Sequence, residues 1–137
     1  MAERALDVRD DGERGSAVVD FVMVSILIVT LLLAVLQVAV YVHVRNVATA
    51  SAQEGARYAA NADVDSALGA ARTVEIVARA TSQQTADGLR CTSAEEVDPS
   101  GLTLVVVRCS GSVPALLASL GNLLPLEVTG RSVKEAA

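Results

Sequence analysis

Residues 13–45 read ERGSAVVDFVMVSILIVTLLLAVLQVAVYVHVR, and this stretch decides the fold. No charged residue occurs between Phe21 and Val42. A helix rises 1.5 Å per residue, so about 20 residues cross a hydrocarbon layer of about 30 Å. The stretch is apolar around the whole helix, whereas a surface helix of a soluble protein keeps a polar face. These features predict a membrane-spanning helix. The polar residues within it are Ser25, Thr30 and Gln37.

Two other interpretations of this stretch are possible in principle, a buried helix of a soluble protein and a cleavable secretory signal. A secretory signal has an apolar core of about 7–15 residues followed by small residues. Small residues in the A-x-A form do follow, at 48–50 and 50–52, but the apolar core is too long. Tyr41 and His43 suit the headgroup boundary at the end of a membrane span. Arg14 and Arg45 flank the two ends, so charge counting leaves the orientation open.

Asp20 places a carboxylate at the start of the apolar run. A charge costs ~2.5–3.5 kcal/mol at the centre of a membrane helix by insertion scales, and less near its ends. The positive end of the helix dipole favours an anion in the first turns. A chain cut after Gly15 would carry a new α-amine on Ser16, four residues before Asp20 on the same helix face. That amine could pair with Asp20 of its own chain or of a neighbour. The other interpretation of Asp20 is a boundary charge without a role.

A short charged leader ending in Gly15, a carboxylate at the fifth position after it and a long apolar helix resemble the type IV pilin signal. Together with ASAQEGARYAA at residues 50–60, the stretch resembles the TadE-like family, minor pilins or pseudopilins of the Flp/Tad pilus. The resemblance covers residues 13–60 and is only general beyond them. The family usually carries Glu at the fifth position, and Asp20 is one methylene shorter.

The resemblance implies a function and a set of partners. A prepilin peptidase would cut between Gly15 and Ser16, and Asp20 would act as a carboxylate in assembly. The expected partners are other pilin or pseudopilin subunits, the prepilin peptidase and the lipid bilayer. The protein would be a single-pass component of the cell membrane with its C-terminal domain outside the cell, or a component of the pilus itself. The alternative is a secreted or membrane-anchored binding protein unrelated to pili.

Composition and motifs indicate no enzyme. The net charge is −5 and no basic patch occurs, which disfavours nucleic acid as a partner. The sequence contains no G-x-S-x-G, no H-E-x-x-H and no phosphate-binding glycine loop. We therefore expect no catalytic residue, no metal site and no cofactor.

The two cysteines, Cys91 and Cys109, lie in a predicted hairpin. Its strands are Leu89 to Val97 and Leu102 to Cys109, and Asp98 to Gly101 supplies the turn residues. A three-residue loop, with Gly in the left-handed position of a type I turn plus bulge, places the cysteines directly opposite each other. They would form a non-hydrogen-bonded pair, ~4.5 Å between Cα atoms, at the short end of the disulfide range. We expect a disulfide; the alternative is two free buried thiols.

The rest of the chain predicts an α+β fold. A second helix would run from a cap at Asp63 or Asp65 to about Thr81, and Glu54 and Arg57 could pair on the first helix. A short helix is expected at residues 114–120, and alternation at residues 126–129 predicts a third strand. Since no aromatic residue follows Tyr58, the core must be thin and need support from a disulfide, an anchoring helix or a partner chain.

The expected fold is a long N-terminal transmembrane helix continuing outside the membrane, a second helix, and a small antiparallel sheet with a hairpin. The expected division of the chain is a prepilin-type leader at residues 1–15, a transmembrane helix at 16–44, an extended helical region at 45–81 and a small exported β-rich domain at 82–137.

Overall fold

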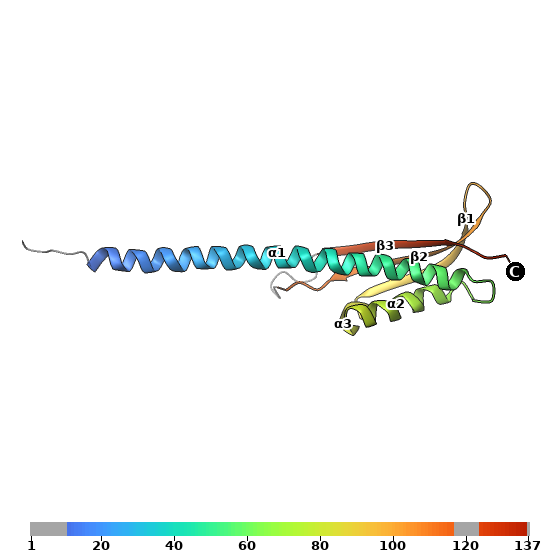
Figure 1. The fold of residues 1–137 in the computed structure, drawn as a ribbon, viewed down its shortest axis with the longest axis horizontal. Coiled ribbons are helices and arrows are strands. Elements are labelled where there is room, and N and C mark those ends of the chain that lie inside the picture. The colour runs from blue at the N-terminus through green and yellow to red at the C-terminus, as the bar shows by residue number, and fades with distance from the viewer. Residues whose placement is uncertain (1–10, 117–123, 137) are drawn as a thin grey trace, which may run out of the picture. The chain divides into compact units, whose positions relative to one another are not determined.

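The computed structural model describes residues 11–116 and 124–136, with residues 11–14 as backbone only. The chain divides into two compact units, one ending at Leu36 and one beginning at Gln37. The fold is α+β, as the sequence predicts, with a long apolar helix, further helices and a small antiparallel sheet (Figure 1). The elements in chain order are α1 (Asp11–Ala60), α2 (Leu68–Ala80), α3 (Gln83–Asp87), β1 (Leu89–Val97), β2 (Thr103–Val113) and β3 (Leu124–Val133).

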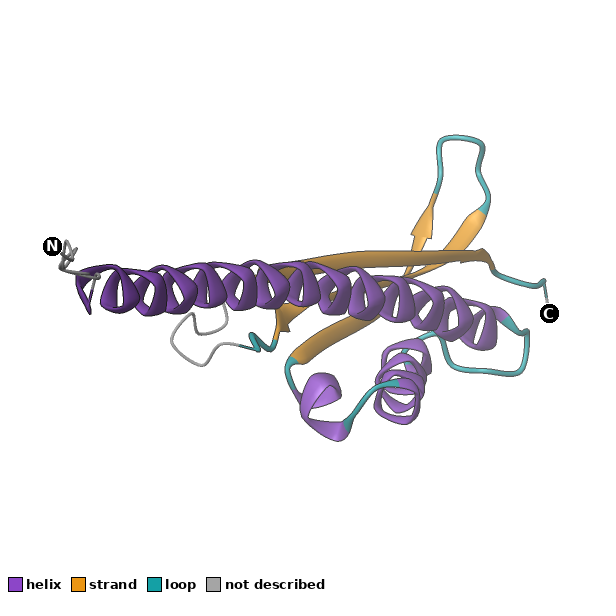
Figure 2. Cartoon of the chain, turned by 60° about the vertical axis from the view of Figure 1, so that its left-hand side comes forward, coloured by secondary structure: helices purple, strands orange, loops and turns teal. Residues whose placement is uncertain are grey.

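The sheet has the order β1-β2-β3, with both neighbouring pairs antiparallel. The predicted register of the hairpin is confirmed, because Cys91 lies opposite Cys109. The turn chemistry is also as expected: Gly101 has a φ of 87°, and its N–H donates to the Asp98 carbonyl at 2.9 Å. The Asp98 N–H donates to the Leu102 carbonyl at 2.9 Å, which closes the loop. The turn projects beyond the rest of the sheet (Figure 2). β2 extends to Val113, four residues past the predicted end.

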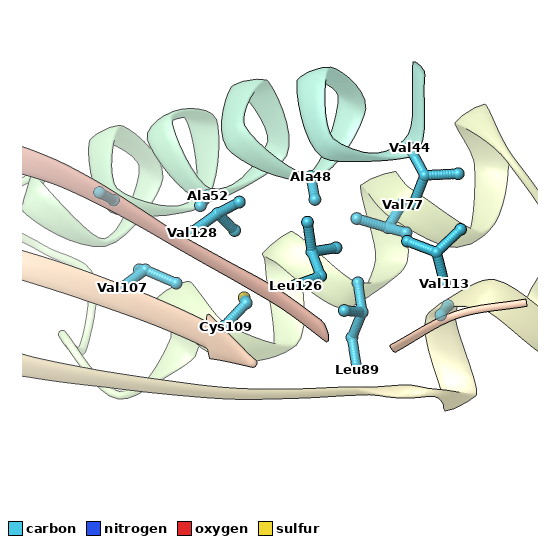
Figure 3. Packing of buried hydrophobic residues seen from close by; sticks show 12 residues of the cluster. Val44, Ala48, Ala52, Val77, Leu89, Val107, Cys109, Val113, Leu126 and Val128 are labelled. Atoms are coloured by element: carbon cyan, nitrogen blue, oxygen red, sulfur yellow. The ribbon is translucent and has the colours of Figure 1, made fainter. Parts of the chain in front are cut away.

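The core of the second unit lies between one face of the sheet and two helices, α2 and the part of α1 after Gln37. Alanine side chains on α1 let the helix approach the sheet closely, and a Cβ added at Gly130 of β3 would lie 2.2 Å from the backbone of Ala52. Apart from Leu89 and Leu126, the core contains small or β-branched residues, so it is thin, as expected. Figure 3 labels its members Val44, Ala48, Ala52, Val77, Leu89, Val107, Cys109, Val113, Leu126 and Val128.

The start of α2 differs from the prediction. The helix begins at Leu68, and the residue before it, Ala67, makes no side-chain capping bond. The Asp65 carboxylate accepts a hydrogen bond from the Ala67 N–H at 2.9 Å and so stabilises the turn that precedes the helix, without capping it. Asp63 does not cap the helix either, and the prediction of a cap at Asp63 or Asp65 is wrong. The end at Ala80 lies one residue from the predicted position.

Three smaller elements remain to be compared with the sequence prediction. The short helix α3 was not predicted, and its N-cap is Ser82, whose hydroxyl accepts from the Thr85 N–H at 3.1 Å. The predicted third strand is confirmed as β3 and is longer than the alternation indicated. The helix expected at residues 114–120 falls largely outside the described residues, and the described part, 114–116, is not helical.

Lys134, the only lysine of the chain, fixes the end of α1. Its ammonium donates to three backbone carbonyls, those of Ala59 at 2.9 Å, Asn61 at 3.0 Å and Val64 at 2.7 Å. The carbonyl end of a helix carries partial negative charge and lacks intrahelical donors, so a cation is favoured there. The chain segment after β3 is thereby joined to the end of α1 and to the loop that follows it.

Candidate functional site

The first unit presents an apolar surface on α1. Apart from Leu33, which is half-buried, its large apolar side chains are exposed, from 73% for Phe21 to 44% for Leu36. Among the described residues, α1 is the one helix long and apolar enough to cross a membrane. Such a helix fits a single-pass membrane anchor. The exposed side chains of this unit are Val18, Val19, Phe21, Val22, Met23, Val24, Ile26, Leu27, Ile28, Val29, Leu31, Leu32, Val35 and Leu36.

Two of the three polar residues in the apolar run satisfy their own hydrogen bonds. The Ser25 hydroxyl donates to the Phe21 carbonyl at 2.7 Å, and the Thr30 hydroxyl donates to the Ile26 carbonyl at 2.7 Å. An unsatisfied donor in hydrocarbon costs several kcal/mol, so these bonds suit the side chains to lipid.

The third polar residue, Gln37, has a different role. Its amide donates to the Pro114 carbonyl at 3.5 Å and accepts from the Leu116 N–H at 2.6 Å. One turn later, the Tyr41 hydroxyl donates to the Pro125 carbonyl at 3.1 Å. The second unit therefore contacts α1 from Gln37 onward, within the segment for which the sequence predicts a membrane span. Sequence reasoning missed both contacts, and the signal available was a lone amide within an apolar run.

Gly15, Ser16 and Asp20 all lie exposed on α1. A Cβ added at Gly15 would meet no atom of the described residues within 4 Å, so none of these residues requires glycine there. Ser16 and Asp20 lie one turn apart on the same helix face, as expected from their spacing. Because α1 already begins at Asp11, Asp20 lies well inside the helix. The positive end of the helix dipole can stabilise the Asp20 carboxylate only if Asp20 lies near the helix start. That requires a cut that makes Ser16 the first residue.

The EGAR motif at residues 54–57 divides between the inside and the outside of the second unit. Gly55 and Ala56 are buried, whereas Glu54 and Arg57 are exposed. A Cβ at Gly55 would lie 2.0 Å from the Thr73 hydroxyl, so the glycine permits α2 to cross α1 closely. No salt bridge joins Glu54 to Arg57 in the described part of the chain. The pairing that the spacing allowed is thus not found.

α1 also protects the free edge of β3. The Gln53 amide donates to the Arg131 carbonyl at 2.6 Å and accepts from the Arg131 N–H at 3.2 Å. Six residues earlier on the strand, Pro125 has no N–H, and its carbonyl is bound by Tyr41. Since open edges promote unwanted pairing, these contacts limit where another strand could add. Gln53 was not among the residues singled out from the sequence.

The charged pairs of the second unit lie on its surface. The pKa of Glu75 is lowered, first by the hydrogen bond from Arg72 and then by the charge of Arg79. The pKa of Glu96 is lowered, mainly by the hydrogen bond from Arg108. Arg72 also lies over the ring of Tyr58, 5.6 Å from its centroid. Within residues 15–116 and 124–136, no group of three or more potential metal ligands lies together.

Cys91 and Cys109 are joined by a disulfide that connects β1 to β2, with their Cα atoms 4.1 Å apart. Cys109 is buried in the core, next to Val107 and Val128. The bridge therefore cross-links the hairpin on the side that faces the helices. Pairing of these two residues is what the loop length predicts.

Comparison with known proteins finds a family similarity for the N-terminal part of the chain. A family model described as TadE-like protein matches residues 15–57. This segment is similar to the TadE-like family. The match begins at Gly15 and ends at Arg57, so it contains Ser16, Asp20 and the EGAR motif. The TadE-like family is a pilus-associated family, and the match suggests an association with the Tad pilus. No curated protein and no solved structure matches the chain.

Proposed function

We propose that this protein is a minor pilin-like structural component that takes part in the assembly of a Flp/Tad-type pilus. The observation that carries the proposal is the TadE-like match at residues 15–57, which begins at Gly15. The matched segment contains, in order, Gly15, the Asp20 carboxylate and a long apolar helix. In this proposal residues 1–15 are a leader, the span lies within residues 16–44, and the remaining chain lies outside the cell.

The packing of α1 argues against release by an ordinary signal peptidase. Ala48 and Ala52, which belong to the two A-x-A sequences, are fully buried against the sheet. A cut after Ala50 or Ala52 would remove Val44 and Ala48, and with them one wall of the core. We therefore favour a protein whose anchoring helix stays part of its folded domain.

The processing step is tested by the mass and N-terminal sequence of the mature protein. We expect loss of residues 1–15, so that the mature chain begins at Ser16. Gly15→Leu should leave the full-length protein, whereas the matched control Gly12→Leu, within the leader, should be cut normally. A mature chain that begins at Met1 or near Gln53 would contradict the proposal.

Asp20 is proposed to act in assembly, through an ionic contact with the α-amine of its own chain or of a neighbouring subunit. Asp20→Ala removes a charge from the edge of the lipid, so membrane insertion should be unimpaired or improved. Cleavage after Gly15 should persist, while association with other pilus subunits falls. The measurements are carbonate extraction, the mature mass and co-purification of the subunits. Normal piliation in Asp20→Ala cells would show that the carboxylate has no such role.

A further inference from the structure

The bond between Gly15 and Ser16, which the proposed processing step breaks, lies inside α1. The helix begins at Asp11, so about one turn of helix precedes this bond. In an α-helix each carbonyl accepts from the N–H four residues later, which commits the Gly15 carbonyl to the N–H of Val19. The bond is therefore part of regular helix on both of its sides.

A peptide bond in a helix is a poor substrate for hydrolysis. The oxygen of water must add to the Gly15 carbonyl carbon. The C–N bond to Ser16 then breaks and the nitrogen takes a proton, which leaves a carboxylate on Gly15 and an α-amine on Ser16. A hydrolase stabilises the charge that develops on the carbonyl oxygen with donors of its own. Because that oxygen is already bound to Val19 in α1, the start of the helix must unwind before the cut.

The start of α1 has the features of a helix end that unwinds easily. The first four N–H groups of a helix have no intrahelical acceptor, and helix ends fray. Residues 11–17 read DGERGSA, in which two glycines, a serine and an aspartate are poor helix formers. Gly12 is one of the first four residues, whose N–H groups are unbonded in any case. Gly15 follows them, so it is the glycine that weakens the bonded part of the helix.

The described fold gives no other reason for glycine at position 15. No atom of the described residues lies within 4 Å of a Cβ added there, so close packing does not require glycine. A left-handed turn does not require it either, since Gly15 is helical and the glycine with a positive φ in the described part of the chain is Gly101. What glycine contributes here is low helix propensity, which raises the unwound population about fivefold relative to alanine.

We propose that Gly15 is a positioning residue that keeps an unwound form of the start of α1 populated, and that the peptidase cuts this form. The inference rests on the processing step proposed above. Because only the unwound form is cut, the rate is proportional to its population. A substitution that strengthens the helix slows the cut, and a second one that weakens the helix nearby restores it. An enzyme pocket that only excludes a side chain at position 15 would give no such restoration.

The test measures kcat/KM for the cutting of the full chain in nanodiscs by a purified prepilin peptidase, together with hydrogen exchange of the amides of residues 16–19. We expect Gly15→Ala to lower both rates about fivefold. Adding Ala17→Gly, which removes one methyl group from an exposed residue, should return both to the wild-type values. Ala34→Gly is the matched control, because the same change at an exposed residue farther along α1 should leave the Gly15→Ala values unchanged.

The contrary results separate this inference from the processing step itself. If Gly15→Ala is cut as fast as the wild type, unwinding of the helix does not limit the cut. If the rate of cutting does not follow the amide exchange across these variants, the peptidase recognises glycine at position 15 directly. Either result overturns the inference and leaves the processing step standing. A wild-type chain that is not cut after Gly15 overturns the processing step, and the inference with it.

Discussion

Gly55 shows how a motif residue serves the fold. It lies on α1 where α2 crosses, and a Cβ there would approach the Thr73 hydroxyl to 2.0 Å and the Gly69 carbonyl to 2.6 Å. Glycine is a poor helix former, costing about 1 kcal/mol relative to alanine in a helix interior. Glycine is needed at this position despite its low helix propensity, because there is no space for a methyl group where α2 crosses α1. Glu54 and Arg57, on the outer side of the same motif, are exposed.

We expect Gly55→Ala to destabilise the second unit, even though alanine favours the helix. The clash is with backbone and a buried hydroxyl, and overpacking of this kind costs roughly 1–3 kcal/mol. The matched control is Gly88→Ala, where the nearest atom to the added Cβ is 3.4 Å away. Urea titration of the detergent-solubilised chain, followed by proteolysis of the unfolded fraction, measures the free energy of unfolding of both variants. Equal stability of the two variants would contradict the close crossing.

The site residues proposed from the sequence are those that a local pattern defines. Gly15, Ser16 and Asp20 stand at fixed distances from the start of the apolar run, and the family match contains all three. Gln37 and Lys134 could not be assigned in this way, because their partners are more than 65 residues away in the chain. A long-range contact of a polar side chain leaves no periodic signal.

At the scale of elements, the hairpin was predictable, whereas the position on α1 where the second unit begins was not. The turn at residues 98–101 sets the register through its own backbone, so the position of Cys91 opposite Cys109 follows from a local feature. The apolar residues of α1 suit both lipid and a protein core, so hydropathy shows no change at Gln37. Only the contacts with Pro114 and Leu116 reveal where the second unit begins.

The hairpin turn should also be sensitive to acid. The pKa of Asp98 is lowered, first by the hydrogen bond from the Ser100 hydroxyl and then by that from the Leu102 N–H. A carboxyl whose pKa is depressed on folding adds stability above its usual value of 3.8. That contribution is lost as the pH falls through the lower pKa of the folded protein.

We therefore expect the wild-type chain to lose stability below pH 3.8 more steeply than Asp98→Asn, and Ser100→Ala to be intermediate. Thermal unfolding of the three proteins, measured at a series of pH values around and below 3.8, gives their stabilities. Glu75 and Glu96 also have lowered pKa values, but they contribute equally to all three proteins. Parallel pH profiles for the wild type and Asp98→Asn would show that the turn does not depend on the charge of Asp98.

At the scale of the whole molecule, a small unit with few large apolar residues is held together by three separate supports. α1 forms one wall of the core, Lys134 fixes the end of α1, and the disulfide joins two strands. The thin core was predictable from composition, and the disulfide from the cysteine spacing. The contribution of Lys134 was not, since one cation near the end of a sequence gives no indication of three carbonyl partners.

The disulfide connects the stability of this unit to its location. Cys91 and Cys109 are 18 residues apart, and closing a loop of that size contributes about 3 kcal/mol in the chain-entropy model. We expect the variant with both cysteines changed to alanine to lose roughly that amount, a large share of the stability of so thin a core. A bridge persists in an oxidising compartment and is rare in the cytosol, so its presence in cells also tests on which side of the membrane the unit lies.

The measurement is thiol labelling of the denatured protein taken directly from cells, before and after reduction. We expect labelling only after reduction, for the membrane-inserted wild-type chain. Cys91→Ala serves as the control, because it leaves Cys109 free to react without reductant. Full labelling of the wild type before reduction would contradict the bridge in cells, and it would place the second unit on the reducing side of the membrane, where a role in an extracellular pilus could not follow.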